Sequence, residues 1–511
     1  MTQTLIRTKK ELISWKKSIN QDINFVPTMG NLHKGHIKLI ESATNYHANT
    51  TLLSIFVNPL QFDNKKDFTN YPNTIEKDID IAFKSGADAI FIPTNEEIFP
   101  KDKNINFIKA CKILTSSLCG VKRTGHFDGV CTVVYRLIKL INPVNLFLGE
   151  KDWQQVLIIK KMISDKELKV KVKTIPTLRD FDGAPYSSRN TLLSEEDRKH
   201  LMLFSQELVN TKNLFVKEKK IEINNLKRTL NQYNISIEYL ELVNAYDLQE
   251  TTERDNISLL AGAIICGSTR LIDHVFLMKK HPVIAIDGPA GSGKSTVTKL
   301  IAKKLNYIYL DTGAMYRALS WFLINEKINY KDNNELKRCL EKISITFQSD
   351  SSSIQDVFIN KYCVTKEIRT QEINKIVSSI ASIAIVREFL VKEQRKIGAS
   401  GGLVAEGRDT ATTVFPDAEL KIFLNASIEE RANRRTIELK NTGTEEINLE
   451  DIKAQIKQRD FDDSNREISP LTKDKKAIEI FTDGYTVEEI AEKILEEYNQ
   501  IIPKEISIEN V

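Results

Sequence analysis

The stretch from His281 to Leu300, HPVIAIDGPAGSGKSTVTKL, decides the fold of the half of the chain in which it lies. Val283–Ile286 is a short apolar run that predicts a strand buried on both faces, and apolar residues with helical spacing follow Lys294. The turn between them, Gly288–Ser295, spells G-x-x-x-x-G-K-S. The backbone N–H groups of such a turn, together with the helix N-terminus, bind phosphate. We therefore expect a phosphate-binding loop, because an ordinary glycine-rich turn rarely joins these fixed positions to a strand and a helix.

Side chains of this loop have expected roles with a nucleotide. Lys294 would reach the β- and γ-phosphates, which makes it the catalytic candidate of this half, and Ser295 would hold Mg²⁺. The residues expected to bind ATP here are Gly288, Gly291, Ser292, Gly293, Lys294, Ser295 and Thr296.

Length and composition indicate an ordinary globular protein of several domains. The 511 residues exceed what one hydrophobic core supports, and 41% hydrophobic with 28% charged residues is typical of globular proteins. A net charge of +4 over this length does not indicate nucleic-acid binding. The six cysteines form no C-x-x-C pair, the N-terminus does not resemble a signal peptide, and no apolar run is long enough to cross a membrane. We expect reduced thiols, a cytoplasmic location, and neither nucleic acid nor membrane as a partner.

Alternating strand and helix patterns occupy the front half of the chain. Apolar runs at Asn24–Val26, Thr51–Asn58 and Asp88–Pro93 predict strands, and helical spacing separates them. This alternation predicts a parallel sheet with helices on both faces, and such sheets bind ligands beyond the C-terminal ends of their strands. Polar-rich loops fall at or near such ends at Thr28–His36, Asn58–Phe62, Gly149–Asp152 and Asp182–Asn190.

The pair His33 and His36 allows three interpretations. The imidazoles could bind a structural zinc ion, although the sequence offers no nearby cysteine or third ligand. They could be solvated side chains at a helix start. They could also lie where a helix N-terminus meets phosphate, and donate hydrogen bonds to charge that develops during attack. We favour the third interpretation.

The stretch PTMGNLHKGH (Pro27–His36) resembles the nucleotide-binding signature of the class I nucleotidylyltransferase superfamily, in which two histidines bracket a glycine. The motifs around it resemble one family of this group, pantoate–β-alanine ligase. These motifs run in order from Pro27 to Asp273 and read PTMGNLHKGH, SIFVNPLQF, YPNTIEKD, GHFDGVCTVVYRL, FLGEKDWQQ, SSRN and STRLID. One departure is Tyr186, which stands where the family usually has an aliphatic residue, but Ser187–Arg189 are intact.

The resemblance implies an ATP-dependent condensation of pantoate with β-alanine to pantothenate. The pantoate carboxylate would attack the α-phosphorus of ATP and release pyrophosphate, and the β-alanine amine would then attack the pantoyl adenylate and release AMP. The resemblance also implies a Rossmann-like domain over residues 1–190, a small lid subdomain over residues 191–280, and a homodimer through this half.

Individual residues of the front half receive roles from the same resemblance. His33, His36, Lys151 and Arg189 would be catalytic, because they would stabilise charge on the phosphates and on the leaving pyrophosphate. ATP, with Mg²⁺ bridging its phosphates, would be bound by Met29, Gly30, Asn31, Leu32, Lys34, Gly35, Gly149, Glu150, Asp152, Leu178, Tyr186, Ser187 and Ser188. Pantoate would be oriented by Asn58, Gln61 and Gln155.

The back half carries arginines on several loops after the phosphate-binding loop, as phosphoryl transfer requires. A single arginine is more often a surface residue. Arg408, however, follows Gly407 at a predicted strand end, where ligands bind, so we favour a functional role for it. The pattern resembles cytidylate kinase, of the P-loop nucleoside-monophosphate kinase group, although Thr312 and Glu406 stand where relatives often carry Ser and Asp. The matching motifs, between Ile286 and Arg466, are IDGPAGSGKST, LDTGAMYR, IRTQEI, EGRD, FPDAELKIFL, RANRR and RDFDDSNR.

This second resemblance implies phosphorylation of CMP or dCMP by ATP. The acceptor phosphate would be held by Arg317, Arg408 and Arg466, and its ribose by Asp463. Arg369 and Asp409 would face the cytosine, because a carboxylate can accept a hydrogen bond from the N4 amine, which uracil lacks. A short mobile lid that excludes water would be formed by Arg431, Arg434, Arg435 and Arg459.

Together the halves resemble a fusion of the two families, with an α/β fold throughout, the ligase over residues 1–280 and the kinase over residues 281–511. Other interpretations stay open from the residues: a different adenylyltransferase in front, a uridylate or adenylate kinase behind, or a regulatory nucleotide sensor. A sensor would have lost its catalytic side chains, whereas His36, Lys151, Lys294 and Arg408 are all present.

Overall fold

The computed structural model describes residues 3–62, 68–100, 105–252, 255–349, 355–441 and 448–508. The chain divides into two compact units. The first unit comprises Met1–Lys279 together with the segment that begins at Pro503, and the second unit comprises Lys280–Ile502. The expected join at residue 280 lies within one residue of this division. The segment from Pro503, which is expected to belong to the back half, instead belongs to the first unit.

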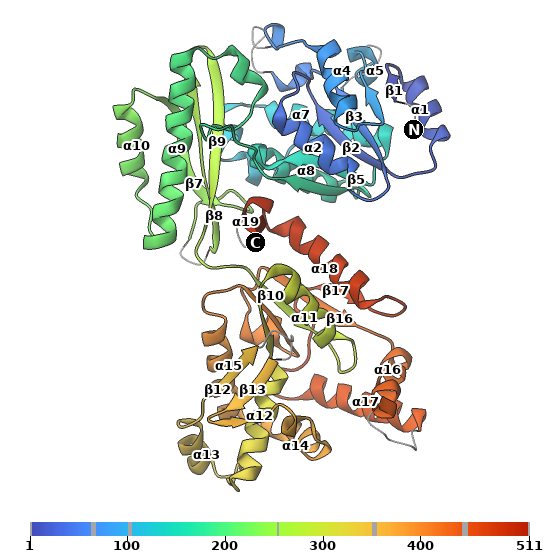
Figure 1. The fold of residues 1–511 in the computed structure, drawn as a ribbon, viewed down its shortest axis with the longest axis vertical. Coiled ribbons are helices and arrows are strands. Elements are labelled where there is room, and N and C mark those ends of the chain that lie inside the picture. Colours follow the sequence, from blue (N-terminus) through green and yellow to red (C-terminus); the bar gives the residue numbers. More distant parts are fainter. Residues whose placement is uncertain are drawn as a thin grey trace. The chain divides into compact units, whose positions relative to one another are not determined.

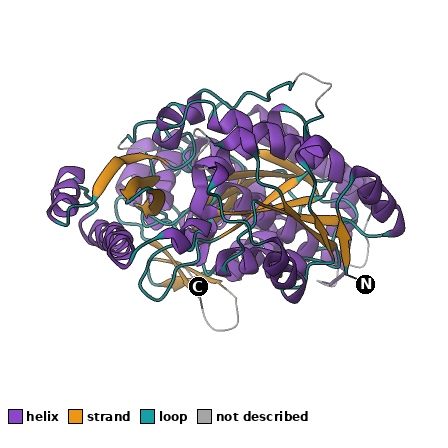
Figure 2. Cartoon of the chain, turned by 90° about the horizontal axis from the view of Figure 1, so that it is seen from above, coloured by secondary structure: helices purple, strands orange, loops and turns teal. Residues whose placement is uncertain are grey.

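A parallel sheet of six strands forms the centre of the first unit, in the order β1-β4-β3-β2-β5-β6 (Figure 1). Its strands are β1 (Thr4–Ile6), β2 (Ile23–Thr28), β3 (Thr50–Ile55), β4 (Ala89–Phe91), β5 (Asn145–Gly149) and β6 (Lys171–Ile175). Its helices are α1 (Lys9–Ser18), α2 (Lys34–Thr44), α4 (Ile75–Lys84), α5 (Asn95–Ile98), α6 (Leu118–Lys122), α7 (His126–Ile141) and α8 (Trp153–Asp165). Figure 2 shows helices on both sides of the strands, as the buried faces of a parallel sheet require.

The order of the strands decides where this sheet can bind a ligand. β2 is almost entirely buried, and its Phe25 pairs with Leu52 of β3 and with Leu146 of β5. The chain passes from β2 to β3 on one side and adds β5 on the other side, so the strand order reverses at β2. Such a reversal leaves a crevice beyond the C-terminal ends of the two strands, where α/β proteins bind ligands.

A smaller antiparallel sheet and two helices follow in the first unit. These elements are α9 (Glu195–Glu218), α10 (Ile223–Gln232), β7 (Ser236–Asn244), β8 (Ile257–Cys266) and β9 (Thr269–Met278), with the strands paired in chain order. Phe204 and Leu208 of α9 pack with Leu260 and Val275 in an apolar cluster. These elements lie within residues 191–280, where the sequence analysis expects a small subdomain.

One more helix, α19 (Lys504–Ile508), packs against β6 and β9 of the same unit. Its Ile506 is buried. Five residues are too few to display a helical periodicity, so no pattern in the sequence predicted that the chain returns here.

A parallel sheet of five strands forms the centre of the second unit, in the order β11-β15-β10-β16-β17. Its strands are β10 (Val283–Asp287), β11 (Ile308–Asp311), β15 (Leu403–Gly407), β16 (Leu420–Asn425) and β17 (Ile478–Phe481). An antiparallel insertion contains β12 (Ile345–Ser349), β13 (Gln355–Ile359) and β14 (Tyr362–Cys363). The helices are α11 (Lys294–Leu305), α12 (Thr312–Asn325), α13 (Asn333–Leu340), α14 (Gln371–Ala381), α15 (Ala384–Ile397), α16 (Ile428–Asn441), α17 (Leu449–Asn465) and α18 (Val487–Ile501).

The expected α/β class is confirmed, with a phosphate-binding loop between the central strand β10 and helix α11. The expected strand Thr51–Asn58 ends earlier, at Ile55, because Asn58 leaves the sheet and caps a short 3₁₀ turn at Pro59–Gln61. No helix within the described ranges is long and apolar enough to cross a membrane.

Candidate active sites

The first unit contains a cavity of about 250 Å³ at the C-terminal ends of β2 and β5. Its walls come from the loops after β2, β5 and β6 and from the N-terminus of α2. The expected site residues that line it are Met29, His33, Gly35, His36, Gln61, Gly149, Lys151, Asp152, Gln155, Leu178, Tyr186, Ser187, Ser188 and Arg189. The fold therefore brings most of the predicted residues of the front half into one cavity.

His33 and His36 start helix α2, with 4.0 Å between their ring centroids. Nδ1 of His33 accepts a hydrogen bond from the Gly35 N–H at 3.1 Å. Nδ1 of His36 accepts one from the backbone N–H of His33 at 3.4 Å. A neutral imidazole that accepts at Nδ1 carries its proton on Nε2. Both rings therefore keep an Nε2–H donor for the cavity that they line.

Burial keeps both imidazoles neutral at physiological pH. It lowers the pKa of His33 to about 2, and the charge of Lys151 acts in the same direction. It also lowers the pKa of His36 to about 4, although Asp78 and Asp152 oppose this shift. Neutral N–H donors at a helix N-terminus suit an anion. The zinc interpretation gains no support, since the described part of the chain has no cluster of three His, Cys, Asp or Glu residues that could hold a metal.

Positive charge and neutral amides share this cavity. Nζ of Lys151 lies 3.7 Å from the Asp152 carboxylate. The guanidinium of Arg189 lies 5.9 Å from the centre of the Tyr71 ring. The side chain of Gln61 accepts a hydrogen bond from Asn58 at 2.8 Å. Cations beside neutral amides can bind a triphosphate and a hydroxylated carboxylic acid together.

Several expected residues of the front half do not line the cavity. Asn58 is fully buried, and its Oδ1 accepts from the Leu60 N–H at 3.2 Å, so it positions Gln61 instead of lining the wall. The ammonium of Lys34 lies 5.5 Å from the centre of the Tyr186 ring. The side chain of Glu150 is fully buried and binds another part of the first unit.

Asp78 of α4 holds the loop after β2, a role that the sequence did not assign to it. Its carboxylate accepts hydrogen bonds from the backbone N–H groups of Asn31 and Leu32, both at 2.8 Å. Gly30 has a φ of +84°, and a Cβ at this position would lie 3.0 Å from the same carboxylate. The buried carboxylate of Asp78 therefore holds the backbone of this loop in place. The loop residues Gly30, Asn31 and Leu32 do not line the cavity. Asp78 is the last residue of the motif YPNTIEKD, and its place in that motif is the sequence feature that could have pointed to it.

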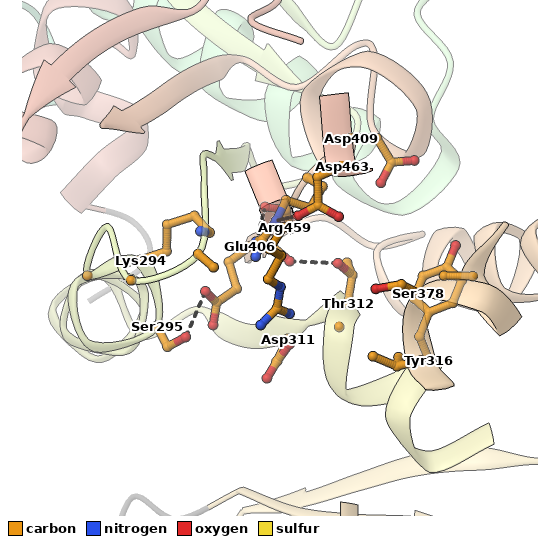
Figure 3. Close-up of a pocket in the computed structure, with 18 of the residues that line it drawn as sticks. Lys294, Ser295, Asp311, Thr312, Tyr316, Ser378, Glu406, Asp409, Arg459 and Asp463 are labelled. Carbon is orange, nitrogen blue, oxygen red and sulfur yellow. Dashed lines mark hydrogen bonds and ion pairs between the residues drawn. The ribbon is translucent and has the colours of Figure 1, made fainter. Parts of the chain in front are cut away.

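The second unit contains a larger cavity of about 1100 Å³ at the C-terminal ends of β10, β11 and β15 (Figure 3). The expected residues that line it are Gly291, Gly293, Lys294, Ser295, Thr296, Arg317, Arg408, Asp409, Arg434, Arg435, Arg459, Asp463 and Arg466. Gly288, Ser292, Arg369 and Arg431 are not among the lining residues. A cavity of this size exceeds the usual volume for one small ligand and can take two.

The phosphate-binding loop is tightly packed around Lys294. A Cβ at Gly288 would lie 2.0 Å from the carbonyl oxygen of Leu424, so only glycine allows the loop to leave β10 beside β16. Nζ of Lys294 donates to the carbonyl oxygens of Gly288 at 2.8 Å and Pro289 at 2.7 Å. Burial lowers the pKa of this ammonium to about 7, and the charge of Arg408 acts in the same direction.

A hydroxyl and a carboxylate meet at the end of this loop. Oγ of Ser295 donates to Glu406 at 2.9 Å (Figure 3). The hydroxyl of Tyr309 donates to the other carboxylate oxygen. Burial raises the pKa of Glu406, and the nearby Asp311 adds to this effect. Mg²⁺ usually takes one or two such oxygen ligands beside the phosphates of a nucleotide. The residues present therefore fit Mg²⁺.

Arginines beside the loop are held by carboxylates. Arg317 pairs with Asp311 at 2.7 Å, and Arg408 pairs with Asp463 at 2.9 Å. These cations therefore have a fixed orientation before any anion binds, which is the condition for electrostatic stabilisation without reorganisation.

Asp409 is paired with an arginine that the sequence analysis missed. Arg387 of α15 is buried and donates to the Asp409 carboxylate, and Arg466 lies 3.8 Å from the other oxygen. Arg369, which was expected at this place, is exposed in a short 3₁₀ turn and does not line the cavity. Arg387 belongs to none of the quoted motifs, so only its position in the fold reveals it.

Helices α16 and α17 carry the arginines expected in the mobile lid. Arg431 pairs with Asp460 at 2.7 Å. Arg434 donates to the Thr482 hydroxyl at 3.1 Å. Arg459 is a lining residue, and burial lowers its pKa, with a further contribution from Arg408. Three of the four arginines face the cavity of the phosphate-binding loop, while Arg431 binds across to α17.

The fold and these cavities define the class of the protein: it joins two nucleotide-dependent transferase-type sites, one at a histidine-capped helix and one at a P-loop. Comparison with known families agrees. The family described as pantoate-beta-alanine ligase matches residues 2–276, and the family described as cytidylate kinase matches residues 284–500.

Relatives of this chain carry both parts. A protein of Prochlorococcus marinus subsp. pastoris named bifunctional pantoate ligase/cytidylate kinase is 62% identical, over 100% of both chains. A protein of the same name from Prochlorococcus marinus strain MIT 9312 is 62% identical, over 99% of this chain and 100% of its own. A solved pantothenate synthetase from Thermus thermophilus is 32% identical and covers 54% of this chain and 99% of its own, with a TM-score of 0.49. This chain belongs to the bifunctional pantoate ligase/cytidylate kinase family, and it is an enzyme that uses ATP.

Proposed function

We propose that the first unit condenses pantoate with β-alanine through a pantoyl adenylate, and that the second unit phosphorylates CMP or dCMP, each with ATP as co-substrate. One observation carries this proposal: each unit gathers most of its predicted phosphate-binding residues in a single cavity at the C-terminal edge of its own parallel sheet. Two complete sites in one chain favour two separate reactions over one composite reaction.

In the first cavity, the Nε2–H groups of His33 and His36 donate to the phosphates of ATP. Lys151 and Arg189 hold the leaving pyrophosphate, the first as a point charge and the second as a planar fork. Gln61 orients pantoate together with Gln155. Because neither imidazole is charged, the cavity can also accept the pantoate carboxylate without binding it too tightly to react.

In the second cavity, the loop around Lys294 holds the ATP phosphates, and Arg317 and Arg408 hold the phosphate of the acceptor. Asp409 accepts a hydrogen bond from the N4 amine of cytosine, and Arg387 holds the carboxylate in place. This assignment favours a cytidylate over a uridylate acceptor, because uracil presents a carbonyl oxygen at the same position.

Mg²⁺ fits both reactions. In the second cavity, Ser295 and Glu406 would hold the ion, which when bound neutralises charge on the phosphates. In the first cavity, the half-exposed Asp152 is the one carboxylate among the described lining residues, so Mg²⁺ would be carried mainly by ATP itself.

Two further expectations complete the proposal. The protein would be cytoplasmic, which the six unpaired cysteines support. It would form a homodimer through the first unit, as the family resemblance implies. Sedimentation of the chain would show twice the 58.3 kDa of one copy, and a species of single mass would contradict the dimer.

A paired assay tests the function directly. With pantoate, β-alanine and ATP the enzyme should release AMP, and with CMP and ATP it should release ADP. Omitting β-alanine should slow steady AMP release, because the adenylate would not turn over. Release of ADP with UMP or AMP in preference to CMP would contradict the acceptor, and absence of both turnovers would favour a nucleotide sensor.

A further inference from the structure

The C-terminal helix α19 lies against the first unit although the chain reaches it only after passing through the whole second unit. The match to the cytidylate kinase family ends at residue 500, and the match to the ligase family ends at residue 276. The segment from Pro503 therefore lies outside both family matches. In Figure 1, α19 (dark red) lies beside β9, and it also packs against β6.

The N-terminus of α19 is bound by one buried carboxylate of the first unit. Oε1 of Glu150 accepts a hydrogen bond from the Lys504 N–H at 2.6 Å, and Oε2 accepts from the Glu505 N–H at 2.9 Å. Glu150 is fully buried, between Gly149 and Lys151, and both of these neighbours line the nucleotide cavity. A buried carboxylate without donors is costly, so these N–H groups stabilise the fold of the loop after β5.

A second contact joins α19 to the loop after β6. The backbone N–H of Thr177 donates to Oε1 of Glu505 at 2.9 Å. Thr177 and Leu178 both line the nucleotide cavity. Leu178 is also a residue that the family resemblance assigns to ATP. Glu505 and the N-terminus of α19 thus contact both loops that flank the expected position of the nucleotide.

We propose that α19 is a positioning element of the ligase site: through Glu150 and Thr177 it fixes the two loops that bind ATP, so the segment that follows the kinase part completes the ligase part. The inference rests on the proposed location of ATP in the first cavity. It gives a physical reason for the two activities to share one chain, since the ligase site depends on residues at the far end of the kinase sequence. The raised pKa of Glu150, to about 6 through burial and through the nearby charge of Glu505, agrees with a carboxylate that needs its donors.

The test compares variants of the full chain. One variant ends after Ile502, a second carries Glu505→Ala, and a third carries Glu505→Gln, whose amide oxygen can still accept from Thr177. Glu492→Ala, at an exposed glutamate of α18, is the matched control. For each protein, KM and kcat for ATP are measured in pantoate-dependent AMP release and, separately, in CMP-dependent ADP release.

We expect the shortened chain and Glu505→Ala to raise the ligase KM for ATP about tenfold, with a smaller effect on the KM for pantoate and kinase kinetics within about twofold of wild type. Glu505→Gln should restore the ligase KM to within about threefold, and Glu492→Ala should change neither reaction. A merely structural role would lower the amount of active ligase, and so kcat, without this selective change in KM.

An unchanged ligase KM for ATP in the shortened chain would overturn the proposal. If that chain does not fold, the two Glu505 variants decide: equal KM values for Ala and Gln would overturn it as well. A wild-type chain without any ligase turnover would instead contradict the proposed function, and the two failures are therefore distinguishable.

Discussion

The two nucleotide sites of this chain meet phosphate charge in different ways. In the first unit, the groups at the helix N-terminus are two neutral imidazoles, each with its proton on Nε2. In the second unit, the corresponding group is the buried ammonium of Lys294, and arginines paired with carboxylates surround it. The difference follows from the chemistry: one site must also admit a carboxylate nucleophile, and the other must hold the phosphates of two nucleotides close together.

Carboxylate partners keep the arginines of the second cavity ordered in the absence of bound phosphate. Arg317, Arg387 and Arg408 each have a carboxylate partner, and an incoming phosphate can share or replace it. The first cavity needs no such pairs on its two imidazoles, because a neutral N–H donor does not repel its neighbours. Four predictions test this difference between the two sites.

The largest expected effect is that of Lys294→Ala. Removing the buried ammonium should lower the kinase kcat/KM about 10³-fold, because charge on the transferred phosphoryl group loses its main positive partner. Pantoate-dependent AMP release should stay within about twofold. Lys304→Ala, at an exposed lysine of the same helix, is the control and should leave both rates unchanged. If Lys294→Ala silences both reactions, the two sites are not independent.

A somewhat smaller loss is expected for His36→Ala. Loss of one Nε2–H donor should reduce the ligase kcat/KM about 10²-fold, and kinase activity should remain. His200, a partly exposed residue of α9, provides the control substitution His200→Ala. His36→Gln can donate through its amide and should recover part of the loss. Retained ligase activity in His36→Ala would remove this imidazole from the site.

Base choice in the kinase should change more modestly. Asp409→Ala removes the acceptor for the cytosine amine, so the ratio of kcat/KM for CMP to that for UMP should fall about tenfold. Arg387→Ala should lower the same ratio, because the carboxylate loses the partner that orients it. Asp417→Ala, at an exposed aspartate, serves as the control. An unchanged ratio in Asp409→Ala would place the base elsewhere and weaken the cytidylate assignment.

The smallest effect is expected in the pH dependence of kcat/KM, which compares the charged lysine of one site directly with the neutral imidazoles of the other. The pKa of Lys294 is lowered to about 7 by burial, so the charged fraction in the free enzyme falls as pH rises. Between pH 7 and 8 the kinase kcat/KM for ATP should fall about fivefold, whereas kcat should change less because bound phosphate favours the ammonium. The imidazoles of the ligase, with pKa values of about 2 and 4, stay neutral from pH 6 to 8. Ligase kcat/KM should therefore show no inflection near pH 6.5, and one there would contradict neutral histidines.

Local patterns in the sequence were enough to predict the two helix starts that border the cavities. The G-x-x-x-x-G-K-S turn and the pair His33 and His36 each lie within a few residues, and both start a helix as expected. Strand–helix alternation predicted the parallel sheets, because period and turn residues are local properties. The expected join at residue 280 also rests on a local pattern, since a new strand and loop begin just after it.

The contacts that position these site residues could not be predicted in this way. Asp78 binds Asn31 and Leu32 across 46 or more positions of sequence, and Arg387, 22 positions before Asp409, replaces the expected Arg369. No periodicity marks such partners, because the side chains meet only after the sheets have formed.

By itself, the sequence determined the helix starts at His33 and Lys294 and the α/β class, since each depends on neighbouring residues. The tertiary structure alone decided which carboxylate holds which cation, and that Glu150 binds the N-terminus of α19, 354 positions away. The physical reason is the same in each case: a buried charge must find its partner in space, and the fold, not the spacing along the chain, decides which partner is near.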